Sequence, residues 1–126
     1  MKITWEPSVD YIIALFNDQI KSGTLMNRKG LMSTLDKVKW GLPFKGQPSI
    51  WEKVAILYKD LIDGHYFSDG NKRIGSLMAY IYLSKNGFEF SPPIGEILSF
   101  TLEVAQGTKS EKEILDWFKT NSRKIE

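Results

Sequence analysis

The chain has 126 residues, of which 42% are apolar and 25% are charged, and its formal net charge is +2. These values fit one folded domain over residues 1–126 and exclude a disordered chain. The small net charge predicts no direct binding of nucleic acid or of an acidic membrane. With no cysteine and one histidine, disulfides, thiolate catalysis and a structural zinc site are not expected.

The sequence also predicts no targeting or membrane-spanning segment. Glu6 and Pro7 come before any long apolar run, so we expect no signal peptide. The longest apolar run, residues 77–83, is far too short to span a bilayer. We therefore expect a soluble cytoplasmic protein that does not interact with membranes.

Apolar residues at helical spacing predict two helices in the first third of the chain. The first covers about residues 8–21 and stops before Gly23, and the second ends near Trp40 and Gly41. Residues 24–29 are polar and are expected to form a loop. The apolar positions are Val9, Ile12, Ile13, Phe16 and Ile20 in the first helix, and Leu31, Leu35 and Val38 in the second.

Residues 41–48 contain two glycines and two prolines, which predicts a loop because neither a helix nor a central strand tolerates so many breakers. Leu42 and Phe44 within this segment are apolar, which suggests a small flap that docks on another surface. An ordinary connection with two buried anchors is the alternative, and the sequence leaves both open.

A third helix is predicted to begin at Ser49, where Glu52 completes a capping box. We expect Gly64 to end this helix in the left-handed conformation, which places His65 just past its C-terminus. Residues 74–83 are apolar on nearly every side, so they predict a buried central helix against which all the other helices pack.

Residues 88–90 are expected to be short and extended. Ser91, followed by two prolines, predicts the start of a fifth helix that continues to Gly107, and a capping box at Ser110 and Glu113 predicts a sixth. The expected apolar positions of the fifth helix are Ile94, Ile97, Leu98, Leu102 and Ala105. The predicted fold class is therefore all-α, a compact single-domain bundle of about six helices with a short flap between the second and third.

The stretch from His65 to Arg73 carries the predicted chemistry. A glycine turn, a carboxamide and two adjacent cations stand at the start of the fourth helix, where unpaired N–H groups and the helix dipole favour a bound anion. Asp69 beside such a site suits Mg²⁺ held together with phosphate oxygens. His65 suits a general base, since histidine titrates near neutral pH.

The same residues have structural interpretations. Asp-Gly-Asn is a common turn sequence, and Ser68 or Asp69 could cap the fourth helix. A histidine near a helix C-terminus is often only a partner of the helix dipole. Each residue taken singly favours the structural interpretation, and the combination favours a site.

The stretch resembles the signature of the Fic/Doc superfamily, H-x-F-x-D/E-G-N-x-R, in which the loop joins two helices of an all-α core. The matching residues are His65, Phe67, Asp69, Gly70, Asn71 and Arg73. The Fic pattern proper continues as G-N-G-R-x-x-R, whereas this chain has Lys72 for the second glycine and Ser76 for the last arginine. Lysine at the first of these positions is similar to the death-on-curing (Doc) branch, which carries N-K-R.

The resemblance implies a transferase that uses ATP and Mg²⁺ to modify a hydroxyl of a protein. Doc toxins transfer the γ-phosphoryl group to a threonine of translation elongation factor Tu and arrest growth, whereas Fic enzymes mostly transfer AMP. Lys72 and Ser76 favour the Doc type, because the lysine adds a charge near the phosphates and the serine removes a bidentate clamp. AMP transfer to an unknown target is the alternative, favoured by Gly70.

The resemblance also implies a role for each motif residue. His65 would deprotonate the target hydroxyl, Asp69 would hold Mg²⁺ and help to orient His65, and Phe67 would anchor the loop in the core. The anion hole would be formed by Asn71 and the amides of Gly70 and Lys72. The phosphates would be bound by Gly70, Asn71, Lys72 and Arg73.

Partners follow from the same resemblance. The flap would pair with the target, through Leu42, Phe44, Lys45 and Gly46. A separate antitoxin would cover the groove with a helical segment. An internal inhibitory helix is the alternative, because residues 122–126 match the spacing S/T-x-x-x-E but not the residue that follows it. A non-catalytic binding module is a third class, disfavoured because both His65 and Asn71 are present.

Overall fold

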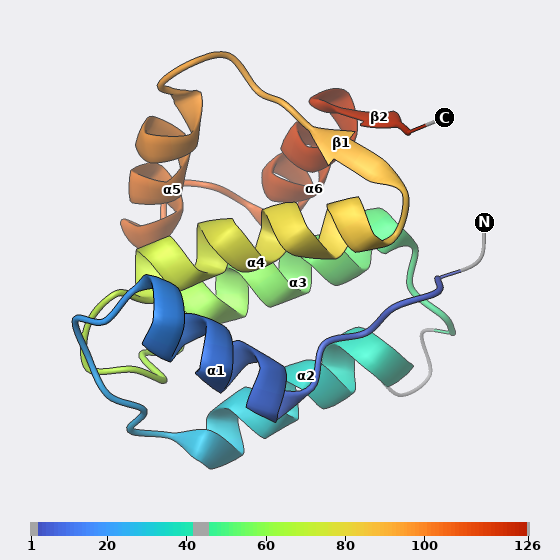
Figure 1. Cartoon of the computed structure of the whole chain (residues 1–126). Coiled ribbons are helices and arrows are strands. Elements are labelled where there is room, and N and C mark those ends of the chain that lie inside the picture. Colours follow the sequence, from blue (N-terminus) through green and yellow to red (C-terminus); the bar gives the residue numbers. More distant parts are fainter. Residues whose placement is uncertain (1–2, 42–45, 126) are drawn as a thin grey trace.

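The computed structural model describes residues 3–41 and 46–125. Within these ranges the chain forms six helices and one pair of short strands, which confirms the predicted all-α fold class (Figure 1). None of the helices in these ranges is long and apolar enough to cross a bilayer. The elements are α1 Val9–Gln19, α2 Arg28–Trp40, α3 Ile50–Asp63, α4 Asn71–Lys85, β1 Phe88–Phe90, α5 Glu96–Ala105, α6 Glu111–Thr120 and β2 Ser122–Lys124.

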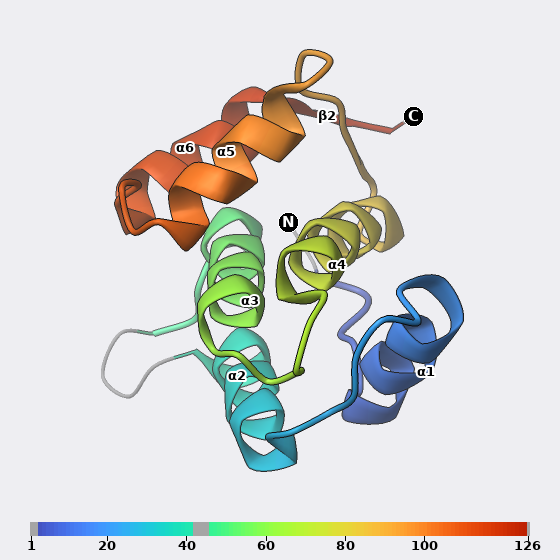
Figure 2. The same ribbon diagram turned by 90° about the vertical axis from the view of Figure 1, so that its left-hand side faces the viewer.

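The helices are arranged in three layers. α3 and α4 run antiparallel in the middle, α1 and α2 lie below them, and α5 and α6 lie above them in the view of Figure 1. Figure 2 shows the same layers along the axis of α4, with the loop between α3 and α4 at the front. The predicted starts of α3 and α6 are confirmed, since Ser49 and Ser110 both form capping boxes.

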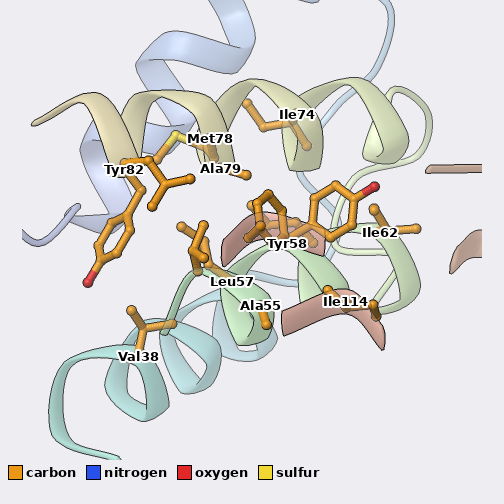
Figure 3. Close-up of a cluster of buried hydrophobic side chains, with 14 of the residues drawn as sticks. Val38, Ala55, Leu57, Tyr58, Ile62, Ile74, Met78, Ala79, Tyr82 and Ile114 are labelled. Carbon is orange, nitrogen blue, oxygen red and sulfur yellow. The ribbon is translucent and has the colours of Figure 1, made fainter. Parts of the chain in front are cut away.

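The prediction that residues 74–83 form a central helix contacted by all the others is only partly correct. α3 is the helix that packs against α2, α4, α5 and α6. α4 buries one broad face, on which Ile74, Met78 and Ala79 are at most 1% exposed and belong to the same apolar cluster as Leu57 and Tyr58 of α3 (Figure 3). The opposite face of α4 reaches solvent at Tyr80, which is 48% exposed.

The fifth helix differs from the prediction in both its start and its orientation. α5 begins at Glu96 after a left-handed Gly95. The predicted start, Ser91, lies outside the helix, and its N–H donates to the carbonyl of Asn121 at 2.9 Å. Its buried residues are Phe100, Thr101 and Val104, and Phe100 stacks on Trp117 at 3.9 Å. The predicted apolar positions are all exposed: Ile94 lies before the helix, and the others on its exposed face are Ile97, Leu98, Leu102 and Ala105.

The last element of the described chain is the strand β2. β2 pairs antiparallel with β1, in a register that places Arg123 opposite Glu89. Nη2 of Arg123 also forms an ion pair with Glu89 at 2.7 Å. The alternative of an inhibitory helix over residues 122–126 is therefore wrong for residues 122–124, which belong to this strand.

Candidate active site

At one end of the α3–α4 pair lies a hollow of about 420 Å³. Its wall consists of the end of α3, the loop between α3 and α4, the start of α4 and the end of α5 (left side of Figure 1). The structure thus brings the predicted catalytic and phosphate-binding residues together around one space. The lining residues are Ile62, Asp63, His65, Ser68, Asp69, Gly70, Asn71, Lys72, Arg73 and Ala105.

The backbone turns sharply at His65, which has a φ of 51°. The expected left-handed Gly64 is wrong, because Gly64 stays in the helical region with a φ of −75°. A glycine is needed there for a different reason: a Cβ on Gly64 would lie 2.5 Å from the ring of Tyr66. A left-handed histidine costs about 1–3 kcal/mol and persists only where the surroundings impose it. Such strain, on an exposed side chain at the rim of the hollow, is typical of a functional residue.

A segment between α1 and α2 supports the loop from behind. Leu25 forms a β-bridge with Phe67, and the N–H of Ser68 donates to the carbonyl of Thr24 at 2.9 Å. The N–H of Thr24 in turn donates to Oγ of Ser68 at 3.0 Å. The sequence predicted only a polar loop here, since pairing between segments about forty residues apart leaves no local signal.

Phe67 and Asn71 close the loop from inside. Phe67 is 2% exposed, and its ring stacks on Phe16 of α1 with centroids 3.9 Å apart. Nδ2 of Asn71 donates to the carbonyl of Phe67 at 2.8 Å, and Oδ1 of Asn71 accepts from the N–H of Phe67 at 3.1 Å. The carboxamide therefore shapes the loop, and its second amide hydrogen is left for a ligand.

The start of α4 is open toward a ligand. Its N-cap is Gly70, with a φ of 80°, and among the residues that the structure describes no side chain caps the first turn. The alternative in which Ser68 or Asp69 caps this helix is therefore wrong. The first N–H groups of a helix lack partners within the helix, so they and the helix dipole favour an anion here. Only glycine fits at this N-cap, because a Cβ on Gly70 would lie 2.5 Å from Ile20.

The charged residues of the hollow are largely exposed. Asp69 and Arg73 have side chains that are 68% and 57% exposed, and Nη2 of Arg73 lies 3.8 Å from Oδ2 of Asp69. The same nitrogen donates to Oγ of Ser22 at 2.5 Å. Lys72 is exposed in the first turn of α4. Within the described ranges no hydrogen bond joins Asp69 to His65. No direct contact therefore supports the implied role of Asp69 in orienting His65.

These features point to known proteins. A family model described as the Fic/DOC family matches residues 14–83, more than half of the chain. The chain belongs to the Fic/Doc family. No curated protein matches the chain. The match extends from α1 to the end of the apolar part of α4 and so includes the entire motif loop. Fic/Doc proteins are protein-modifying transferases that use ATP, generally with Mg²⁺.

The donor set of this Fic/Doc site fits Mg²⁺ in one particular way. In the part of the chain that the structure describes, no three acidic or histidine side chains gather as a metal cage. Asp69 supplies one exposed carboxylate beside a helix N-terminus that favours phosphate. Mg²⁺ is usually held by one or two carboxylates, water and substrate phosphates, so Asp69 with a bound nucleotide is an adequate set.

A second hollow of about 400 Å³ lies between α2, α3 and α6 and contains none of the Fic/Doc motif residues. Its three lysines each pair with a carboxylate within 3.0 Å. The pairs are Lys37–Asp60, Lys59–Asp63 and Lys112–Asp116. The hydrogen bond that Lys59 donates to the carboxylate of Asp63 raises the pKa of Lys59, as expected for an engaged ammonium group. Because its three lysines are engaged in this way, this hollow offers no free ammonium group for an anionic ligand among the described residues.

The predicted target-docking flap falls mostly outside the described residues. Leu42, Phe44 and Lys45 are among the positions 42–45 that the structure does not describe. Gly46, at the end of the flap, is exposed and has a φ of 71°. The docking role of the flap stays a prediction.

Proposed function

We propose that the protein is a Doc-type kinase, which transfers the γ-phosphoryl group of ATP to a hydroxyl of a protein. This proposal rests on the two positions of α4, Lys72 and Ser76, at which the chain differs from the Fic pattern. Ser76, at the position of the second Fic arginine, bonds Thr101 of α5 through their hydroxyls at 3.1 Å. Lys72, in place of a Fic glycine, lies at the rim of the hollow. Phosphates would therefore meet Lys72 and Arg73, without a second guanidinium from α4.

In the proposed reaction His65 accepts the proton of the target hydroxyl, whose oxygen attacks the γ-phosphorus. The bond from that phosphorus to the bridging oxygen of ADP breaks, and ADP leaves with the electron pair. Asn71 and the first amides of α4 would stabilise the charge on the transferred group, as preorganised donors do. Asp69 would hold Mg²⁺, which would neutralise charge on the phosphates.

AMP transfer is the second candidate, because Gly70 and the uncapped start of α4 would bind the triphosphate of ATP in either orientation. In that reaction the hydroxyl would attack the α-phosphorus and pyrophosphate would leave. The two candidates share His65 and differ in which part of ATP remains on the target.

We further propose a translation elongation factor as the target, with the flap at residues 42–46 pairing with its backbone. Transfer to such a factor would stop translation, and we expect it to take place in the cytoplasm, where ATP and the target are found. Replacing Phe44 with alanine should weaken modification of the target and leave nucleotide binding unchanged. Loss of both would count against the docking role.

A separate antitoxin is the partner that we propose as inhibitor. Ala105 at the end of α5 lines the hollow, and three residues on the same exposed face are apolar. They are Ile97, Leu98 and Leu102, which are 40%, 79% and 47% exposed. Apolar positions at this spacing suit the apolar face of a partner helix, which would then extend over the hollow.

Growth of a bacterium that expresses the chain tests the proposed function. The intact chain should arrest growth and produce a new phosphoprotein, and His65→Ala should do neither. Equal growth of both strains with no labelled protein in either would contradict the proposal.

A further inference from the structure

A serine outside the motif contacts the arginine of the motif. Nη2 of Arg73 donates to Oγ of Ser22 at 2.5 Å and lies 3.8 Å from Oδ2 of Asp69. The second distance is beyond a hydrogen bond. Asp69 precedes the N-cap of α4 and Arg73 lies in the first turn of that helix, so the two opposite charges are near enough to attract each other. Without another partner, this guanidinium would be expected to close on the carboxylate at about 2.8 Å.

The backbone around Ser22 is held firmly against the loop. A Cβ on the adjacent Gly23 would lie 2.8 Å from the carbonyl oxygen of Asp69, so only glycine allows this approach. The next residue, Thr24, exchanges two hydrogen bonds with Ser68. The hydroxyl of Ser22 thus belongs to a segment whose position relative to Asp69 is fixed by the two residues that follow Ser22.

We propose that Ser22 is a positioning residue of the site, an inference that rests on the proposed function. Its hydroxyl keeps the guanidinium of Arg73 near the carboxylate of Asp69 but out of hydrogen-bonding distance. Arg73 then stays available to a phosphate group, and Asp69 stays available to Mg²⁺. A carboxylate in a direct ion pair is a weaker metal ligand, because the metal must first displace the arginine.

Metal binding in the presence of ATP tests this role directly. Mn²⁺ can stand in for Mg²⁺, because the paramagnetic signal of free Mn²⁺ reports how much metal is bound. Ser22→Ala should weaken Mn²⁺ binding to the ATP complex roughly three- to tenfold, the range expected for one hydrogen bond. Ser22→Thr keeps the hydroxyl and should bind as the wild type does. Ser99→Ala is the matched control, since that exposed serine bonds a carbonyl within α5.

A double-mutant cycle shows whether Ser22 acts through Arg73. In an Arg73→Ala background, removal of the Ser22 hydroxyl should have no further effect on Mn²⁺ binding. Equal binding by wild type and Ser22→Ala would overturn the proposal, as would a loss that persists in the Arg73→Ala background. A lower melting temperature of Ser22→Ala with unchanged Mn²⁺ binding would show a structural role and also overturn it. Failure of the wild type to bind Mn²⁺ and ATP at all would instead overturn the proposed function.

Discussion

The side chain of Asn71 binds the backbone of Phe67 through both ends of its carboxamide, as donor to the carbonyl and as acceptor from the N–H. This pair links the first residue of α4 to the residue that anchors the loop beneath the hollow. Asn71 therefore holds the loop of the site in its conformation, and it is also a candidate ligand of the transferred group. The two contributions can be separated by measuring stability and transfer in the same variants.

Asn71→Asp should destabilise the fold, because the new carboxylate cannot donate to the carbonyl of Phe67 and would face it. We expect a loss of about 1–3 kcal/mol in the free energy of unfolding, together with loss of transfer. Chemical denaturation of Asn71→Asp and of His65→Ala measures the difference. His65→Ala is the control because the exposed side chain of His65 does not hold the loop as Asn71 does. A stability change within about 0.5 kcal/mol would show that Asn71 acts on the ligand alone.

Alkaline pH should destabilise the protein through Tyr58. Burial raises the pKa of Tyr58 from its ordinary value to about 12, and the hydrogen bond to Thr101 opposes this shift only in part. The folded protein thus holds this proton more tightly than the unfolded chain does. The stabilisation is fully present below about pH 10 and is lost as the pH rises through the folded pKa of about 12.

The variant Tyr58→Phe tests this dependence. Its free energy of unfolding should fall less steeply between about pH 10 and 12 than that of the wild type, by at most about 1.4 kcal/mol per pH unit. Burial also raises the pKa of Tyr82, so some alkaline sensitivity should persist in the variant. Denaturation curves at several pH values provide the comparison. Parallel curves for the two proteins would contradict the assignment to Tyr58.

The exposed face of α5 should matter for inhibition and not for transfer. Leu98 is 79% exposed, so Leu98→Lys should change stability by no more than about 0.5 kcal/mol. A protein that relieves the growth arrest caused by the wild type should fail to rescue cells that express Leu98→Lys. Ile125→Lys changes an apolar residue that is 50% exposed and lies beyond β2, and it provides the control. Equal rescue of both variants would place the inhibitor elsewhere.

Local sequence patterns predicted the parts of this fold that local interactions determine. Capping boxes located the starts of α3 and α6 because both partners lie within one turn. The motif residues were expected to share a site, and seven of the nine from His65 to Arg73 line one hollow. Their nearness in sequence, across one loop, made this inference possible.

The parts that the sequence did not predict depend on contacts between distant residues. The orientation of α5 follows from the stacking of Phe100 on Trp117, which outweighs the stripe of aliphatic residues from Ile94 to Leu102. The support of the loop by residues 22–27 comes largely from backbone pairing between segments far apart in the sequence, which leaves no local motif. A glycine at position 64 is compatible both with a left-handed turn and with a side chain packed closely on its backbone. Only the position of the Tyr66 ring, which the sequence does not give, decides between the two.

The most direct test of the central claim is the identity of the group that remains on the target. Purified protein, a translation elongation factor and ATP labelled at either the α- or the γ-phosphate should be incubated with Mg²⁺, with His65→Ala as the control. We predict that the γ label and the mass of one phosphoryl group appear on a hydroxyl of the target, and that His65→Ala transfers neither. Appearance of the α label with the mass of AMP would contradict the proposed kinase activity.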